Sequence, residues 1–172
     1  MGVYDGSGRI LKTFMQGGTL EIWNKNSGIT LIEAIEEALR YDGKCVSKHI
    51  NNPEGPVLEY SMFHNGDKLK VLIVENKNIG ICINTVYPVD ARHLTRNDID
   101  FILYDINAHC ETGAVIYDEE LHILSYGVMY NLNEDASEGI SVDLVLFEAS
   151  DATDTVLDYL DKVREEYNLH IG

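Results

Sequence analysis

The sequence predicts an α+β fold in which helices pack on one face of an antiparallel sheet. Three observations support this prediction. First, two capping signals each predict the start of a helix, one before and one after a series of strand-like segments. Second, a two-residue turn signal lies among those segments. Third, the chain ends with a predicted hairpin and a long helical pattern. Strands joined by short turns pair antiparallel, so the segments between the two helices are expected to build one sheet.

The first predicted helix begins at Thr30. Thr30 and Glu33 have the spacing of a capping box, in which each side chain accepts a hydrogen bond from the backbone of the other residue. Apolar residues at helical spacing give this helix one buried stripe, made of Leu31, Ile32, Ile35, Ala38 and Leu39. Gly43 ends the helix, because glycine readily adopts the left-handed conformation that follows a helix C-terminus.

Four strand-like segments follow, at residues 44–50, 57–64, 68–75 and 78–87. Turn-forming residues separate them at 51–56, at Asn65-Gly66 and at 76–78. Asn65-Gly66 is the most specific local signal, since both residues tolerate the positive φ angles of a type I′ hairpin turn. The four segments are therefore predicted to be successive antiparallel strands.

The second predicted helix begins at Thr95. Asp98 lies in its first turn, where exposed N–H groups and the helix dipole favour a carboxylate. Its buried stripe consists of Ile99, Ile102, Leu103 and Ile106. We expect Asn107, near the end of this helix, to be structural, because its side chain can bond unpaired helix carbonyls or the strand that follows.

The predicted hairpin consists of a strand at 112–118, an acidic turn at Asp118, Glu119 and Glu120, and a returning strand at 121–132. Both faces of the returning strand are substantially apolar, which indicates a strand inside a sheet. Helices on one side of that sheet would leave its other face open. A second copy of the chain could cover the open face, so we predict a homodimer.

The segment 140–147 fits two different structures. Ile140, Val142, Leu144 and Leu146 alternate with other residues, as in a strand. A helical stripe also begins in this segment and comprises Val145, Ala149, Ala152, Val156, Leu160, Val163 and Tyr167. The second half of this stretch is predicted to be helix, whereas periodicity leaves 140–147 open between strand and helix.

Residues 1–28 are rich in glycine and contain two short β-prone runs on either side of Gly17-Gly18. We interpret them as an N-terminal extension or an edge hairpin. Gly6 and Gly8 lack the third glycine and the flanking strand and helix of a nucleotide-binding loop. Residues 29–172 are predicted to form a single α+β domain, a size that can bury one core.

The charge of the chain restricts its partners. The 29 acidic residues against 13 basic ones give a net charge of −16. This balance argues against binding to nucleic acid or to an anionic membrane surface, which both need local positive charge, and it favours a basic protein segment as partner. No long apolar run or signal pattern indicates export, and the three cysteines are an odd number without framework spacing, so we expect a cytoplasmic protein.

Three stretches resemble the YbjN-like family of small bacterial proteins, which share the fold of the type III secretion chaperones. They are the helix end at 106–108, the hairpin at 114–130, and residues 131–147, which lead into the last helix. The resemblance spans residues 31–167. It implies a chaperone-like fold with the order helix, strands, helix, hairpin and long C-terminal helix, and it implies helix rather than strand at 140–147.

Motifs for metal binding or nucleophilic catalysis are weak. Cys45 and His49 would share one face of a strand and Cys82 lies on another, but no C-x-x-C or H-E-x-x-H pattern supplies further zinc ligands. His109 and Cys110 are adjacent on a helix and so point in directions about 100° apart. We interpret Asp118, Glu119 and Glu120 as a solvated turn, because they lack the alternating spacing of a calcium loop. We therefore predict no catalytic, cofactor-binding or metal-binding residue.

One acidic stripe could have a function. Asp151, Asp154, Asp158 and Asp161 are spaced by three, four and three residues, so they lie on one face of the last helix. Two interpretations of this face remain open: it serves solubility alone, or it binds a basic segment of a partner protein.

From these features we predict a non-enzymatic protein-binding domain, either chaperone-like or a regulatory adaptor. Two alternatives remain open. The first is a small-molecule-binding protein or small enzyme whose pocket is lined by Tyr60, Tyr87, Tyr126 and Tyr130. The second is an immunity-type protein that neutralises a basic partner.

Overall fold

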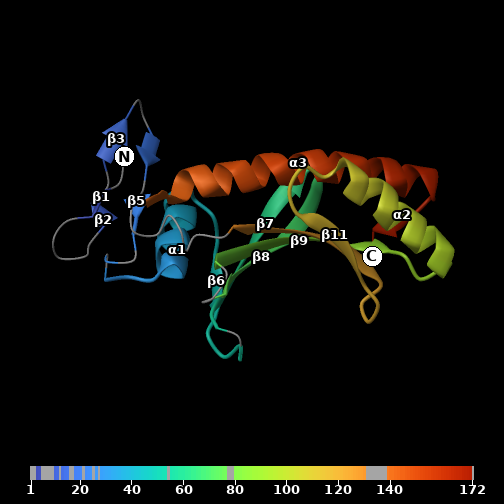
Figure 1. Cartoon of the computed structure of the whole chain (residues 1–172), viewed down its shortest axis with the longest axis horizontal. Helices are drawn as coiled ribbons and strands as arrows, with labels where there is room; N and C mark the ends of the chain where they lie inside the picture. Colours follow the sequence, from blue (N-terminus) through green and yellow to red (C-terminus); the bar gives the residue numbers. More distant parts are fainter. Residues whose placement is uncertain are drawn as a thin grey trace. The chain divides into compact units, whose positions relative to one another are not determined.

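A computed structural model describes residues 3–4, 10–11, 13–15, 18–20, 22–24, 26, 28–53, 55–76, 80–130 and 139–171. These residues form an α+β fold in which helices lie on one face of an antiparallel sheet, so the predicted fold class is confirmed. Six strands lie side by side in the order β11-β12-β9-β8-β7-β6 (Figure 1).

The helices are α1 (Leu31–Tyr41), α2 (Arg96–His109) and α3 (Val142–Glu166). The strands of the six-stranded sheet are β6 (Ser47–His49), β7 (Val57–His64), β8 (Asp67–Asn76), β9 (Gly80–Tyr87), β11 (Ala114–Asp118) and β12 (Ile123–Tyr130). Four short antiparallel pairs complete the described strands: β1 (Val3–Tyr4) with β2 (Ile10–Leu11), β3 (Thr13–Met15) with β4 (Gly18–Leu20), β5 (Ile22–Trp23) with β13 (Ile140–Ser141), and β10 (Val89–Asp90) with β14 (His170–Ile171). Among the described residues, no helix has the length and apolar character needed to cross a membrane.

The chain divides into two compact units. Unit 1 contains Met1–Tyr60, Ile73–Cys82 and Tyr130–Glu148, and unit 2 contains Ser61–Leu72, Ile83–Met129 and Ala149–Gly172. Several strands and α3 contribute residues to both units, so each unit combines segments that are distant in the sequence. The single domain expected over residues 29–172 stays a prediction.

In unit 1, α1 begins as predicted. The Thr30 hydroxyl accepts a hydrogen bond from the Glu33 N–H at 3.2 Å, and the Glu33 carboxylate accepts one from the Thr30 N–H at 3.0 Å. Gly43 follows the helix with a φ of +82°, the left-handed conformation that ends many helices. The buried face of α1 contains all five residues of the predicted stripe together with Ala34.

The first sheet strand is shorter than predicted. The sequence pattern placed it at 44–50, whereas β6 covers only Ser47–His49. Lys44 lies just after α1 and is bonded to its last turn, because the Lys44 N–H donates to the carbonyl of Leu39. The carbonyl of Val46 accepts a hydrogen bond from the Arg40 guanidinium at 2.9 Å instead of pairing with a strand.

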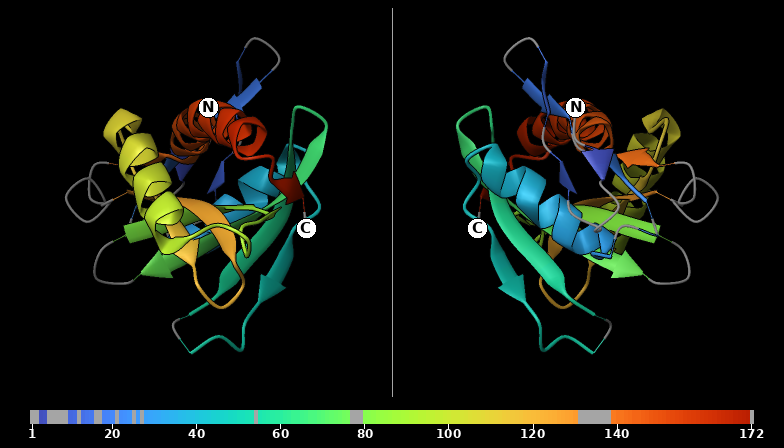
Figure 2. Two further views of the ribbon diagram at one scale, coloured as in Figure 1. Left: turned by 90° about the vertical axis from the view of Figure 1, so that its right-hand side faces the viewer. Right: turned by 90° about the vertical axis from the view of Figure 1, so that its left-hand side faces the viewer.

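In unit 2, α2 begins at the predicted capping box, where Thr95 and Asp98 exchange hydrogen bonds. Ile99, Ile102 and Ile106 are buried as expected. Figure 2 shows α2 beside β11, and the two elements are in contact. This position allows the last turn of α2 to reach the edge strand of the sheet.

One of the two hairpin turns of unit 2 has the predicted length, and the other is longer. Asn65 and Gly66 have φ angles of +48° and +86°, so the predicted turn between β7 and β8 is confirmed. The turn between β11 and β12 is longer than predicted, because β12 begins at Ile123 rather than at residue 121. Asp118 pairs with Ile123, and the Asp118 carboxylate accepts hydrogen bonds from the N–H groups of Glu120 and Leu121.

The ambiguous segment at 140–147 is mostly helix. Ile140 and Ser141 form β13, and α3 starts at Val142. The Ser141 hydroxyl accepts a hydrogen bond from the Leu144 N–H at 3.3 Å, which satisfies one of the unpaired donors of the first helical turn. The strand-like alternation therefore describes only the first two residues.

Candidate functional site

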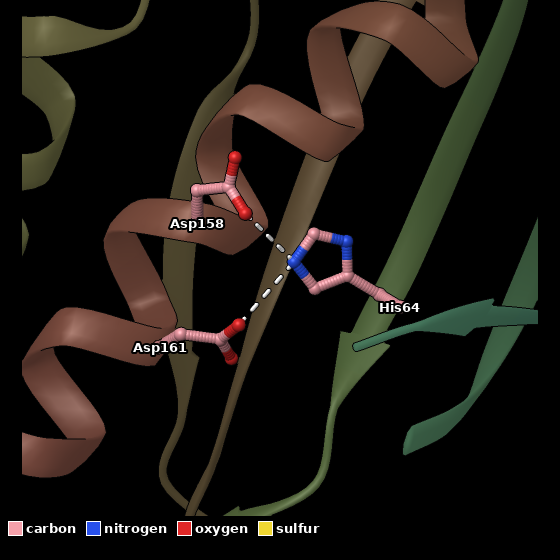
Figure 3. A group of neighbouring side chains, drawn as sticks. All are labelled: His64, Asp158 and Asp161. Carbon is pink, nitrogen blue, oxygen red and sulfur yellow. Dashed lines mark ion pairs between the residues drawn. The ribbon is translucent and has the colours of Figure 1, made fainter. Parts of the chain in front are cut away.

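A buried histidine of unit 2 meets the acidic face of α3. His64 ends β7, and its side chain points toward Asp158 and Asp161 of α3 (Figure 3). The Nε2 atom of His64 lies 3.1 Å from Asp158 Oδ1 and 3.3 Å from Asp161 Oδ2, and its Nδ1 atom lies 3.4 Å from Asp154 Oδ1. We call these four residues the His64 cluster.

The periodicities of the two elements explain this meeting. His64 lies on the buried side of β7, where its side chain is only 9 % exposed. Asp154, Asp158 and Asp161 are spaced by four and three residues, which places their carboxylates above one another on α3. The imidazole therefore faces three carboxylates from one helix.

Asp161 is held in place by groups from other elements. The Tyr87 hydroxyl donates a hydrogen bond to Asp161 Oδ1 at 2.5 Å, and the Asn65 amide donates one to Asp161 Oδ2 at 2.7 Å. Burial acts to raise the pKa of Asp161, but these hydrogen bonds and the charges of His64 and Arg164 outweigh it. The pKa of Asp161 is consequently below its ordinary value.

Tyr87 and Arg164 complete the surroundings of Asp161. Burial raises the pKa of Tyr87, and the hydrogen bond to Asp161 raises it further, so the phenol stays a proton donor. Arg164 forms an ion pair with Asp67 at 2.8 Å and lies 3.8 Å from Asp161 Oδ1. These groups fix one carboxylate of the cluster before any ligand arrives.

The four predicted partner-binding residues separate into different environments. The Asp154 and Asp158 side chains are 55 % and 64 % exposed, and Asp151 is also exposed but is not part of the His64 cluster. The Asp161 side chain is 16 % exposed, and both its oxygens accept hydrogen bonds. The acidic stripe of α3 is therefore not one uniform solvent-exposed surface.

Within the described part of the chain, His64, Asp158 and Asp161 are the residues that could hold a metal ion. Their ligand atoms all lie within 4.8 Å of one another. No sequence motif indicated this group, since His64 belongs to no ligand motif and its partners lie 90 or more residues further along the chain. Cys45, His49 and Cys82, considered from their spacing, are not part of it, and none of the cysteines forms a disulfide.

Other polar residues singled out from the sequence have structural contacts. The His109 ring nitrogen Nδ1 lies 2.7 Å from the carbonyl oxygen of Asp105, and the Cys110 thiol lies 3.9 Å from Asn107 Oδ1. At the turn between β11 and β12, Glu119 pairs with Arg96. These contacts agree with the interpretation of these residues as helix-end and turn residues.

The tyrosines of the alternative prediction do not line the cavity that the structure describes in unit 2. That cavity, of about 320 Å³, is lined by Pro88, Asp90, Arg92, Glu120, Leu121, His122 and Ile123. The Tyr87 hydroxyl is bonded to Asp161, and the Tyr126 hydroxyl donates to the carbonyl of Thr112 at 2.5 Å. A tyrosine-lined pocket stays a prediction.

The strands of unit 2 have one face that carries buried side chains and an opposite face that is more exposed. Alternation along the strands buries residues such as Leu69, Val71, Leu124 and Tyr126 and leaves their neighbours on the other face. We call this other face the open face; it is made of Ser61, Phe63, Lys68, Lys70, Leu72, Asn84, Val86, Ala114, Ile116, Ser125, Gly127 and Met129.

Large apolar side chains are exposed on the open face. Phe63, Ile116 and Met129 are 69 %, 56 % and 52 % exposed. Lys68 and Lys70 lie on the same face, although the chain as a whole is strongly acidic. Ile116 and Met129 lie on the neighbouring strands β11 and β12, and Phe63 lies on β7. Large apolar side chains exposed on one face of a sheet are typical of a binding site for another protein.

Comparison of the chain with family models, with curated proteins and with solved structures gave no match. The resemblance to the YbjN-like family therefore stays a prediction.

Proposed function

We propose that the chain is a non-enzymatic, cytoplasmic protein-binding domain that acts as a homodimer, in a chaperone-like or regulatory adaptor role. The observation that carries the proposal is the open face, where three large apolar side chains lie more than half exposed on one side of a sheet. Burying such side chains removes apolar area from water and favours association.

A second copy of the chain is the occupant that we propose for the open face. The charged residues of this face are Lys68 and Lys70, so the contact does not bring together the acidic residues of two copies that each have a net charge of −16. Most oligomers of soluble proteins are symmetric dimers, in which the same surface of both copies takes part. Contact through the open face would keep the acidic face of α3 at a distance from the equivalent face of the other copy.

The acidic residues of α3 supply the surface for a different partner in this proposal. Asp151, Asp154 and Asp158 are exposed, and a basic protein segment would complement them. The homodimer would then present two such surfaces. This partner class is also what an immunity-type protein would recognise, so the adaptor and immunity roles differ in the identity of the partner rather than in the surface used.

The homodimer is tested by replacing apolar residues of the open face with lysine. We expect the double variant Ile116→Lys, Met129→Lys to sediment as a monomer at tens of micromolar, where the unaltered chain sediments as a dimer. Charged groups would have to be buried at the interface, and their desolvation opposes association. Both side chains are exposed, so the fold should tolerate the change.

The matched control is Phe101→Lys. Phe101 is 62 % exposed on α2, also in unit 2, but it lies outside the open face. We expect this variant to remain a dimer. A strictly monomeric unaltered chain, or equal loss of dimer in both variants, would overturn the proposal.

A further inference from the structure

We propose that His64, Asp158 and Asp161 form a binding site for a divalent cation of the zinc class. The three ligand atoms come from two elements of unit 2 and converge on one point (Figure 3). The site is complete within one copy of the chain. Its test is therefore independent of the proposed dimer.

Two of the distances between ligand atoms are close to those around a tetrahedral metal ion. Bonds of about 2.0–2.2 Å to nitrogen and oxygen place neighbouring ligand atoms of a tetrahedral zinc ion about 3.3–3.6 Å apart. His64 Nε2 lies 3.1 Å from Asp158 Oδ1 and 3.3 Å from Asp161 Oδ2. All three ligand atoms lie within 4.8 Å of one another, so a single ion can lie among them.

Neighbouring residues orient the proposed ligands His64 and Asp161 for metal binding. Asp154 Oδ1 lies 3.4 Å from Nδ1 of His64. A carboxylate at this position favours the tautomer with the proton on Nδ1, in which the lone pair of Nε2 faces Asp158 and Asp161. Asn65 and Tyr87 donate hydrogen bonds to Asp161 and fix its carboxylate. Histidine ligands of metals commonly have a carboxylate on their second nitrogen, as His64 has here.

The charges around this point favour a cation. The carboxylates of Asp158 and Asp161 both lie within 3.3 Å of His64 Nε2. The Asn65 amide lies 3.2 Å from Nε2 and donates to Asp161 Oδ2, so a metal ion would bind beside this amide. Mixed nitrogen and carboxylate ligands favour zinc over magnesium or calcium, which prefer oxygen ligands alone.

The groups around the site carry a net negative charge, which favours a cation there. The titratable and charged groups that face the imidazole and its carboxylates come from three elements. They are Asp154, Asp158, Asp161 and Arg164 of α3, Asp67 of β8, and Tyr87 of β9.

The test is a calorimetric titration of the full, chelator-treated chain with zinc alone, combined with NMR of the histidine ring nitrogens. We expect one equivalent to bind, with the largest change at Nε2 of His64. Asp158→Asn should weaken binding at least about 10-fold, and Asp154→Asn should weaken it about 10-fold or more through the histidine. Magnesium at the same concentration should not displace zinc.

The matched control is Asp151→Asn, which removes the same charge from the same helix outside the His64 cluster and should leave zinc affinity unchanged. Asp158 is largely exposed, so Asp158→Asn should fold, and its circular dichroism spectrum checks this. Equal zinc binding by the unaltered chain and Asp158→Asn, or an unmoved His64 signal, would show that the cluster is an ion pair only and overturn the site.

Discussion

Gly113→Ala is expected to lower the free energy of unfolding by about 3 kcal/mol, corresponding to a fall in Tm of roughly 6–12 °C for a chain of this size. Gly113 has a φ of +71°, which costs an alanine about 1–2 kcal/mol. An added Cβ would also overlap the carbonyl oxygen of Gly127 and lie 2.9 Å from the Tyr126 hydroxyl. Because the first of these is backbone, the crowding cannot be relieved by a side-chain rotation.

Gly66→Ala separates strain from crowding in this prediction. Gly66 has a similar φ of +86°, but an added Cβ would meet nothing within 4 Å. Gly66→Ala should therefore lower the free energy of unfolding only by the cost of placing alanine at a positive φ, about 1 kcal/mol. Thermal unfolding of both variants measures the difference, and equal losses would contradict the close approach of Gly113 to β12.

Asn107→Ala should destabilise the fold by about 1–3 kcal/mol, as the loss of a buried hydrogen-bonding partner does. The Asn107 amide donates to the carbonyl of Val115 at 3.0 Å, and its oxygen accepts from the Val115 N–H at 2.7 Å. Val115 is buried on β11, the edge strand of the sheet. One side chain of α2 thus satisfies two backbone groups that a further strand would otherwise pair.

Asp105→Ala is the control for Asn107→Ala, since Asp105 is an exposed polar residue of the same helix. Its loss should change stability by less than about 0.5 kcal/mol. Chemical denaturation of the two variants provides the comparison. The folded fraction of Asn107→Ala should still dimerise, and loss of dimerisation with full stability would assign Asn107 to a binding site instead.

Local signals made much of the fold predictable. The capping boxes at Thr30 and Thr95 and the turn at Asn65-Gly66 act within a few residues, so their geometry follows from the sequence nearby. The two-atom bridge of Asn107 to the following strand was also predictable, because β11 begins only a few residues after α2.

Features that depend on several contacts at once were less predictable. Residues 140–147 fit both the strand period and the helix period. The structure resolves the ambiguity, because α3 starts at Val142. The acidic turn before β12 extends to His122, which has a φ of +55°. No residue type in this segment predicts the extra length of the turn.

The His64 cluster was not predictable from spacing. The hydrogen bond between Asn65 and Asp161 joins residues 96 positions apart, and His64 and Asp158 are similarly distant. A single histidine in a strand-like segment does not predict which helix will pack against that strand. The acidic stripe was correct as a helical pattern, but the burial of Asp161 depends on Tyr87 and Asn65 from other elements.

Contact between two copies through the open face is the central claim, and mixed-isotope cross-linking tests it most directly. Light and ¹⁵N-labelled chains are mixed, allowed to exchange, and treated with a short amine-reactive reagent, so that cross-links between copies carry a mixed mass. The proposal predicts mixed-mass links between Lys68 or Lys70 of one copy and Lys68 or Lys70 of the other. Mixed-mass links confined to Lys48 and Lys162, which lie outside the open face, would contradict it.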